Sequence, residues 1–170
     1  MKIGRITVSD RACAGAFVDR SGPEIERALR DALGGEVSFE AAMVPDERAL
    51  IAGTLREFAD RRGCDLVVTT GGTGIGPRDV TPEATREVLE KELPGFGEAM
   101  RMQSLARVNT AILSRATAGV RGRCLIVNLP GKPAAVSECL AILAPAIREG
   151  VVLVHGGDPH QPLAPIEPSP

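Results

Sequence analysis

Aromatic residues are nearly absent from this chain, which has four Phe and neither Tyr nor Trp among its 170 residues. Proteins that bind single-stranded nucleic acid stack bases on aromatic side chains, so this composition argues against that class. The formal net charge is -2, and no stripe of Lys and Arg supplies the positive surface that a general nucleic-acid binder needs. We therefore predict no nucleic-acid partner.

Long apolar runs and export signals are also missing. No window approaches the roughly 20 apolar residues that a membrane-spanning helix requires. Lys2 is followed by no long apolar run, and Asp10 and Arg11 come too early for a signal peptide. We expect a cytoplasmic protein without a membrane partner.

Cysteine and histidine are too few and too scattered for a zinc centre or a disulfide framework. The two histidines lie close to the C-terminus, and no CxxC pair exists among Cys13, Cys64, Cys124 and Cys139. We expect reduced thiols, three of them buried in the core and Cys13 in an exposed loop.

Strand-like and helix-like segments alternate along the chain. Apolar or β-branched runs predict strands at 2–9, 36–44, 64–70 and 123–131, with a further strand and turn within 110–122. Helical spacing and helix-start signals predict helices at 21–35, 46–63, 81–93, 94–108 and 133–154. The alternation predicts an α/β fold, a three-layer α/β/α sandwich around a mostly parallel (mixed) sheet. We assign residues 1–156 to one domain and residues 157–170 to a proline-rich, mobile tail.

Two predicted helices carry clear start signals. Ser21 and Glu24 have the spacing of a capping box. Thr81 precedes Pro82, which predicts an N-cap followed by proline in the first turn.

A glycine-rich loop, GGTGIGPRD, follows the apolar strand at 64–70. Ligands bind at the carboxyl ends of strands in parallel sheets, so the loop lies where a ligand is expected. Backbone N–H groups can point inward as an anion nest where side chains are missing, at Gly71, Gly72, Gly74 and Gly76. Thr73 and Arg78 add a hydroxyl and a cation. The loop matches neither a Walker nor a dinucleotide pattern, because no Gly-Lys-Ser/Thr follows and Pro77 interrupts entry into a helix. A flexible turn without a ligand remains the alternative.

Two acids, Asp46 and Asp79, each stand between a predicted strand and the next helix. Both are expected at the same edge of the sheet, and paired carboxylates beside a phosphate nest commonly hold Mg²⁺. Taken alone, Asp46 fits a helix N-cap better, a role that contributes about 0.5–2 kcal/mol. Asp10 fits a turn residue better than a ligand. These residues indicate phosphoryl or nucleotidyl transfer but name no substrate.

Other polar residues lie near the same edge of the predicted sheet. Ser114 and Asn128 stand at strand ends, where each can donate to a phosphate or a heterocycle, although an ordinary turn hydrogen bond is the alternative. Arg101 and Ser104 lie on the helical stretch after the glycine loop and are within reach of the site.

Several motifs occur in a fixed order along the chain: TVSDRACAG, DRSGPEI, VPDE, TTGGTG, PRDVTPEAT, PGFGEAMR, AILSRATAG and LIVNLPGKP. In these motifs the chain resembles the molybdopterin adenylyltransferase family of molybdenum cofactor biosynthesis (the MogA/MoaB type, and the G domains of the plant and animal fusion proteins). The resemblance covers residues 3–150. It implies a molybdopterin-binding-domain-like fold and a homotrimer.

The resemblance also implies an activity, the transfer of AMP from MgATP to the terminal phosphate of molybdopterin with release of pyrophosphate. Asp46 and Asp79 match the two catalytically important aspartates of the family, and we expect them to hold Mg²⁺. The binding positions that the resemblance implies are Thr70, Gly71, Gly72, Thr73, Gly74, Gly76, Arg78, Ser104, Ser114, Asn128, Pro130 and Gly131. A molybdate-insertion enzyme is an expected partner. The alternatives are a pterin-binding carrier of the MoaB branch without adenylylation activity, and a hydrolase that uses the two aspartates, for which no nucleophile motif is evident.

Overall fold

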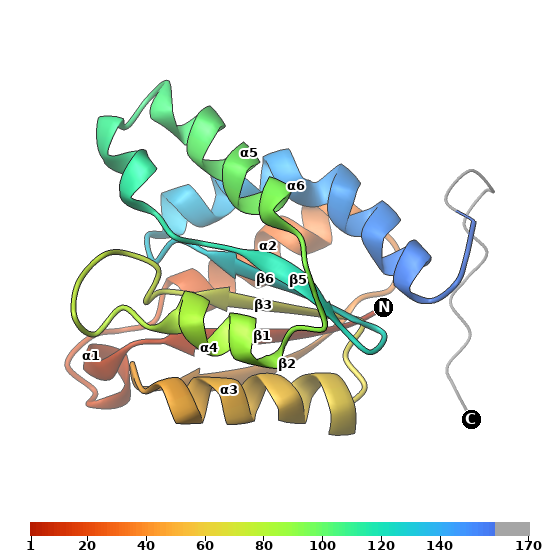
Figure 1. The fold of residues 1–170 in the computed structure, drawn as a ribbon, viewed down its shortest axis with the longest axis horizontal. Coiled ribbons are helices and arrows are strands. Elements are labelled where there is room, and N and C mark those ends of the chain that lie inside the picture. The colour runs from red at the N-terminus through yellow and green to blue at the C-terminus, as the bar shows by residue number, and fades with distance from the viewer. Residues whose placement is uncertain (159–170) are drawn as a thin grey trace.

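The computed structural model describes residues 1–158, and within them six strands form one sheet (Figure 1). The strands are β1 (Lys2–Val8), β2 (Ser38–Val44), β3 (Leu66–Thr70), β4 (Lys91–Glu92), β5 (Ala118–Arg121) and β6 (Cys124–Leu129). Their order across the sheet is β2-β1-β3-β6-β5-β4. β2, β1, β3 and β6 are parallel, whereas β5 is antiparallel to both of its neighbours. The predicted mostly parallel, mixed sheet is confirmed.

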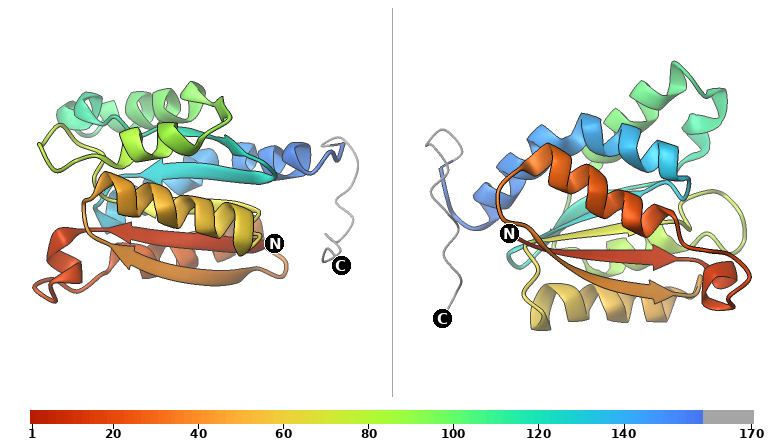
Figure 2. Two further views of the ribbon diagram at one scale, coloured as in Figure 1. Left: turned by 60° about the horizontal axis from the view of Figure 1, so that its bottom comes forward. Right: turned by 180° about the vertical axis from the view of Figure 1, so that it is seen from behind.

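Helices cover both faces of the sheet (Figures 1 and 2). They are α1 (Asp10–Cys13), α2 (Ser21–Leu33), α3 (Arg48–Arg56), the π-helical turn η1 (Glu57–Arg61), α4 (Thr81–Val88), α5 (Pro94–Leu105), the 3₁₀ turn η2 (Asn109–Leu113) and α6 (Pro133–Val154). On one face α2, α5 and α6 contribute Leu29, Met100 and Leu140 to a buried core. On the other face α3 and α4 contribute Leu55 and Val88. The three-layer α/β/α arrangement is therefore confirmed.

The central strands β3 and β6 are buried along their whole length. Successive side chains of a strand point to opposite faces, so Leu66 and Val68 enter the core under α2 and α6 while Val67 enters the core under α3 and α4. Burial on both faces explains why these strands read as continuous apolar runs in the sequence. The edge strand β2 is more exposed.

The predicted helix at 81–93 is too long. α4 ends at Val88, and Leu89 already has an extended backbone. Glu90 then donates its N–H to the carbonyl of Val120 at 2.8 Å, and Lys91–Glu92 pairs with β5. Pairing with β5 satisfies backbone groups that the helical pattern would have bonded within the helix, and this tertiary contact overrides local propensity.

The predicted capping box at α2 is wrong. The carboxylate of Asp19, two residues earlier, accepts hydrogen bonds from the N–H groups of Ser21 and Gly22 at 3.1 and 2.9 Å. Ser21 instead donates its hydroxyl to the carbonyl of Gly131 at 2.8 Å. The start of α2 is thereby tied to the turn after β6.

The predicted caps of α3 and α4 are also wrong. α3 is preceded by Glu47 at the N-cap, which makes no side-chain capping bond, and the Asp46 carboxylate binds elsewhere. α4 has Val80 at its N-cap, so Thr81 is already helical. The capping interpretation of Asp46 is therefore excluded.

The carboxyl ends of the four parallel strands meet at one edge of the sheet, beside α1 and the glycine loop at the left of Figure 1. No helix within residues 1–158 has the length and apolar character to cross a bilayer. Residues 159–170, which are most of the predicted tail at 157–170, lie outside the described residues, and the predicted domain limits stay a prediction.

Candidate active site

A cavity of about 300 Å³ lies at the carboxyl ends of the parallel strands. Chain segments that are far apart in the sequence line it, from β1, from the loops after β2 and β3, and from the turn after β6. Both predicted acids, Asp46 and Asp79, are in the lining, together with Gly71, Gly72 and Gly131. The structure thus brings the two acids and part of the glycine loop into one space.

Gly71 and Gly72 bring the loop close to β1 and α4. Their φ angles are +98° and +62°, a region that residues with side chains rarely adopt. A Cβ at Gly71 would lie 2.2 Å from the carbonyl oxygen of Val8, and a Cβ at Gly72 would lie 2.3 Å from the hydroxyl of Thr81. Side-chain-free backbone is therefore a steric requirement at both positions.

Gly74 and Gly76 surround the carboxylate of Asp79. A Cβ at either glycine would lie 2.8 Å from Asp79 Oδ2, and the N–H of Gly76 donates to this oxygen at 2.8 Å. The N–H of Gly71 donates to the carbonyl of Leu129 at 3.3 Å. The predicted anion nest is therefore smaller than expected, because two of its amides are bonded within the protein and only the remaining amides of the loop can face a ligand.

Asp10 and Asp46 join the loops that follow β1 and β2. The N–H of Asp10 donates to Asp46 Oδ2 at 2.8 Å, and the N–H of Asp46 donates to Asp10 Oδ1 at 3.0 Å. Arg78, which we expected beside the anion nest, donates two hydrogen bonds of 2.9 Å to Asp10. Asp10 is therefore more than a turn residue, since it connects Asp46 to the glycine loop.

Asp46 is partly buried and lies close to two other carboxylates. Burial raises the pKa of Asp46 above its usual value, and the negative charges of Asp10 and Asp79 raise it further. The hydrogen bonds from Arg78, by contrast, lower the pKa of Asp10. A divalent cation between Asp46 and Asp79 would offset the repulsion between the two carboxylates.

Asp46→Asn is expected to keep or raise the melting temperature at neutral pH. The pKa of Asp46 in the folded protein lies above the usual value of 3.8. The fold therefore gains stability from protonated Asp46, fully so below pH 3.8, and loses this gain as the pH rises through the pKa of the folded state. Asparagine removes the buried charge and can still accept the N–H of Asp10. The measurement is thermal unfolding of both proteins at neutral pH and below pH 3.8. The advantage of the variant should vanish in acid, and a loss of several degrees at neutral pH would instead indicate a structural role.

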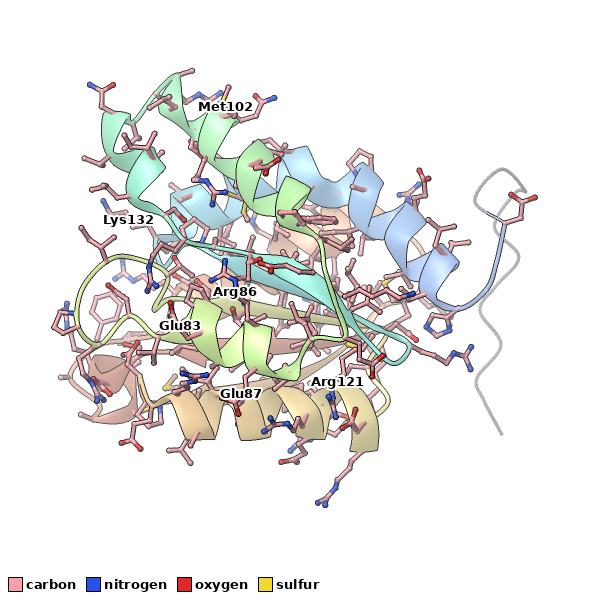
Figure 3. The ribbon with its side chains drawn as sticks, in the orientation of Figure 1. Glu83, Arg86, Glu87, Met102, Arg121 and Lys132 are labelled. Atoms are coloured by element: carbon pink, nitrogen blue, oxygen red, sulfur yellow. The ribbon has the colours of Figure 1, made fainter. Side chains whose placement is uncertain are left out.

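Arg115 holds the glycine loop from the segment before β5. Its N–H donates to the carbonyl of Thr73 at 2.9 Å, and its guanidinium donates to the carbonyls of Gly74 and Asp79 at 2.7 and 2.6 Å. It also forms an ion pair with Glu83 of α4, a residue that is labelled in Figure 3. This residue was missed in the sequence analysis because, within the motif AILSRATAG, only Ser114 was predicted to contact a ligand.

Arg115→Ala is expected to lower the free energy of unfolding by about 1–2 kcal/mol, since it removes several hydrogen bonds at a partly exposed site. Amide hydrogen exchange in residues 72–80 should become faster than in the wild type. The matched control is Arg86→Ala on α4, the helix that carries Glu83 (Figure 3), which removes an ion pair with Glu92 that is more exposed. Unchanged exchange in 72–80 would show that the loop does not depend on Arg115.

Ser104 and Ser114, two of the predicted binding residues, do not line the cavity. The side chain of Ser104, near the end of α5, lies beside the Cys139 thiol of α6. The hydroxyl of Ser114 accepts the N–H of Ala116 at 3.4 Å. Arg101 likewise lies in the packing of α5, where it donates to the carbonyl of Ser114 at 3.2 Å. Their predicted contacts with a ligand stay predictions.

Asn128 is also placed away from the cavity, in the core under α4. Side chains alternate along β6, and this position faces the same layer as Ile126. The amide of Asn128 is fully buried and donates to the hydroxyls of Thr69 and Thr85 at 3.0 and 2.9 Å. Asn128 therefore connects β6, β3 and α4 in the structure.

The turn after β6 lies against the glycine loop. Thr70 donates its hydroxyl to the carbonyl of Pro130 at 2.7 Å and lines the cavity. A Cβ at Gly131 would lie 3.4 Å from the Cα of Gly71. These contacts close one wall of the cavity.

None of the residues between β1 and α2 was predicted to bind a ligand, yet this segment supplies Arg11, Phe17 and Asp19 to the cavity lining, and Ser21 at the start of α2 adds to it. Asp19 also accepts the hydroxyl of Thr7 at 2.7 Å. The signal that could have revealed this wall is an aspartate two residues before a helix start, because such a carboxylate folds back onto the helix N-terminus.

A family model described as "Probable molybdopterin binding domain" matches residues 4–149. The chain belongs to this family, and the resemblance read from its motifs is confirmed.

Relatives that are similar over most of the chain carry more specific names. The protein called molybdopterin adenylyltransferase of Helicobacter pylori strain J99 is 52% identical over 154 residues, which is 91% of this chain and 88% of that protein. The protein of the same name from Escherichia coli K12 is 47% identical over 156 residues, 92% of this chain and 79% of that protein. The structure of the molybdopterin biosynthesis enzyme MoaB from Thermus thermophilus is 46% identical, with a TM-score of 0.80 over 91% of this chain and 96% of that chain. A structure of MogA is 38% identical, with a TM-score of 0.84 over 91% and 99%.

Proposed function

We propose that this chain is a molybdopterin adenylyltransferase that acts in molybdenum cofactor biosynthesis. A phosphate oxygen of molybdopterin forms a bond to the α-phosphorus of ATP, and the bond from that phosphorus to the bridging oxygen breaks, so pyrophosphate leaves. The observation that carries this proposal is the meeting of Asp46, Asp79 and the loop at Gly71 and Gly72 in one cavity. Relatives with this name and about half of their residues identical support it.

The residues of the cavity suit this reaction. The attacking group is already an anionic phosphate, so positioning and charge neutralisation are required rather than a general base. Amides of the glycine loop can bind phosphate oxygens, and Arg115 keeps that loop in place through the carbonyls of Gly74 and Asp79. The two hydrogen bonds between Asp10 and Asp46 fix Asp46 relative to the glycine loop, because Asp10 also binds Arg78 of that loop.

Mg²⁺ is the cation that we propose for the acid pair. Within residues 1–158 no cluster of three or more His, Cys, Asp or Glu side chains is arranged to hold a metal. Asp46 and Asp79 would then share the ion with water and the phosphates of ATP, which is the coordination that Mg²⁺ commonly adopts. The raised pKa of Asp46 fits this assignment, because the nearby charges of Asp10 and Asp79 that help to raise it would be offset by a bound cation. When bound, the ion neutralises charge on the phosphates.

We also propose a homotrimer. Exposed apolar side chains occur on α5 and η2 and in the turn between them, and Met102, labelled in Figure 3, is 71% exposed. The others are Leu105, Val108, Ile112 and Leu113. An apolar surface of this kind gains free energy when another protein covers it. Light scattering that gives the mass of a single chain would contradict the proposal.

The expected location and partner follow from the proposed reaction. We propose the cytoplasm, where thiols stay reduced, and all four cysteines are free in the structure. The adenylylated product is a substrate for a molybdate-insertion enzyme, which we propose as the partner that receives it.

The decisive experiment incubates the purified chain with molybdopterin, ATP and Mg²⁺. We expect release of pyrophosphate and, by mass spectrometry, a pterin heavier by one AMP. Omission of molybdopterin or chelation of the metal should stop both signals. If calorimetry shows binding of molybdopterin but no pyrophosphate appears, the chain is a pterin carrier and the proposed enzyme activity is wrong.

A further inference from the structure

Phe17 stands apart from the other phenylalanines of the chain. Phe58 is fully buried, and Phe39 and Phe96 are packed against the core under α2 and α6. Phe17 is 51% exposed and is the one phenylalanine of the four in the cavity lining, all four lying within residues 1–158. An aromatic ring is therefore held at the same cavity as the two acids and the glycine loop.

Phe17 belongs to neither of the two apolar clusters that form the core. The guanidinium carbon of Arg11, which also lines the cavity, lies 5.0 Å from the centroid of the ring. A cation–π contact of this kind is weak at an exposed site. It leaves half of the side chain open to solvent, and a flat, uncharged ring can stack on that open part.

The neighbouring Val18 provides a comparison within the same loop. Val18 is 75% exposed but does not line the cavity. If ligands contacted the loop only through its general hydrophobicity, probes at positions 17 and 18 would respond alike. If Phe17 binds a ligand in the cavity, only the probe at position 17 should respond.

The rest of the lining selects the kind of ligand. Asp46, Asp79 and the glycine loop suit a phosphate group that carries a divalent cation. A ligand that fills the cavity as far as Phe17 must join this phosphate group to a part that stacks on an aromatic ring. We propose that Phe17, backed by Arg11, is the stacking subsite for the planar heteroaromatic ring of a phosphorylated substrate. This rests on the proposed function, in which both substrates have such a ring, adenine in ATP and the pterin in molybdopterin.

A single tryptophan at position 17 tests the subsite without turnover. The chain contains no Trp and no Tyr, so the variant Phe17→Trp carries one fluorophore at the cavity. We expect saturable quenching by MgATP, by molybdopterin or by both, and little change with Mg²⁺ and pyrophosphate, which has no ring. Quenching by one substrate alone identifies the ring that stacks. The matched control is Val18→Trp, whose emission should not respond in a saturable way. Equal quenching by pyrophosphate, or equal responses of the two variants, would overturn the subsite.

Truncation measures the contribution of the ring to binding. Phe17→Ala should weaken binding of the stacked substrate by roughly 5- to 100-fold, the range expected when one base loses its aromatic partner. The effect should appear in KM, with kcat within about twofold, because stacking holds the substrate equally before and during reaction. Phe17→Trp should retain wild-type KM, whereas Phe17→Leu, which keeps apolar bulk, should resemble the alanine variant. Circular dichroism checks that each variant is folded. Wild-type KM in Phe17→Ala would contradict the subsite.

The two proposals fail in different ways. Quenching of Phe17→Trp by a ring-bearing substrate, with no pyrophosphate released by the wild type, would leave the subsite intact and remove the enzyme activity. Release of pyrophosphate by the wild type, with an unchanged KM in Phe17→Ala, would support the enzyme activity and contradict the stacking subsite.

Discussion

Asp79→Asn is expected to slow AMP transfer by about a thousand-fold, which corresponds to roughly 4 kcal/mol of lost transition-state stabilisation. Asparagine has nearly the same shape, and its amide oxygen can still accept the N–H of Gly76, which the carboxylate accepts at 2.8 Å. The substitution therefore removes charge while the loop stays closed. The measurement is kcat for pyrophosphate release at saturating MgATP and molybdopterin.

The control for Asp79→Asn separates chemistry from folding. Calorimetry should show molybdopterin binding close to that of the wild type, and the melting temperature should change little. Asp31→Asn, on the exposed surface of α2, makes the same chemical change far from the cavity lining and should leave both activity and stability unaffected. Near-wild-type turnover in Asp79→Asn would end the catalytic assignment.

Gly71→Ala is expected to destabilise the protein by about 3 kcal/mol and to abolish activity. The φ angle of +98° is unfavourable for alanine, and the new Cβ would lie 2.2 Å from the carbonyl oxygen of Val8. Val8 belongs to β1, which pairs on both sides with β2 and β3, so this carbonyl cannot move without disrupting the sheet. Denaturant unfolding at neutral pH measures the loss.

Gly53→Ala is the matched control for Gly71→Ala, because it makes the same substitution where a side chain can be accommodated. Gly53 lies in the exposed interior of α3, its φ is not positive, and a Cβ there would meet nothing within 4 Å. Gly53→Ala should therefore stabilise the protein by about 0.5–1 kcal/mol, because alanine loses less backbone entropy in a helix. Similar stabilities of the two variants would mean that the glycine loop can accommodate a Cβ at position 71.

The succession of strands and helices could be predicted from the sequence because each element has its own periodicity. The buried strands β3 and β6 were apparent as short apolar runs, and the long helix α6 was predicted with the bounds that the structure shows, Pro133–Val154. Errors fell where a tertiary contact overrides a local signal. β4 formed from predicted helix because β5 offers it a pairing edge, and Asp19 rather than Ser21 capped α2 because Ser21 is bonded to the turn after β6.

The candidate site was predictable in part. Glycines after a buried strand and acids between strands and helices are local features, and the cavity contains Asp46, Asp79, Gly71 and Gly72 together. Other features of the site depend on partners that are distant in the sequence. These are the carbonyl of Leu129, which accepts the N–H of Gly71, and the carboxylate of Asp10, which accepts hydrogen bonds from Arg78. Binding roles for these residues stay predictions until a ligand is tested.

The sequence by itself determined the alternation of elements, the family, and the presence of a side-chain-free loop with two acids at strand ends. Only the tertiary structure decided that Asp10 links Asp46 to Arg78, that Arg115 holds the loop, that Asn128 turns into the core, and that Phe17 reaches the cavity. The physical reason is that a strand or helix is specified by its own residues. The neighbours of a loop side chain are instead fixed by the strand order β2-β1-β3-β6, which brings separate segments to one edge of the sheet.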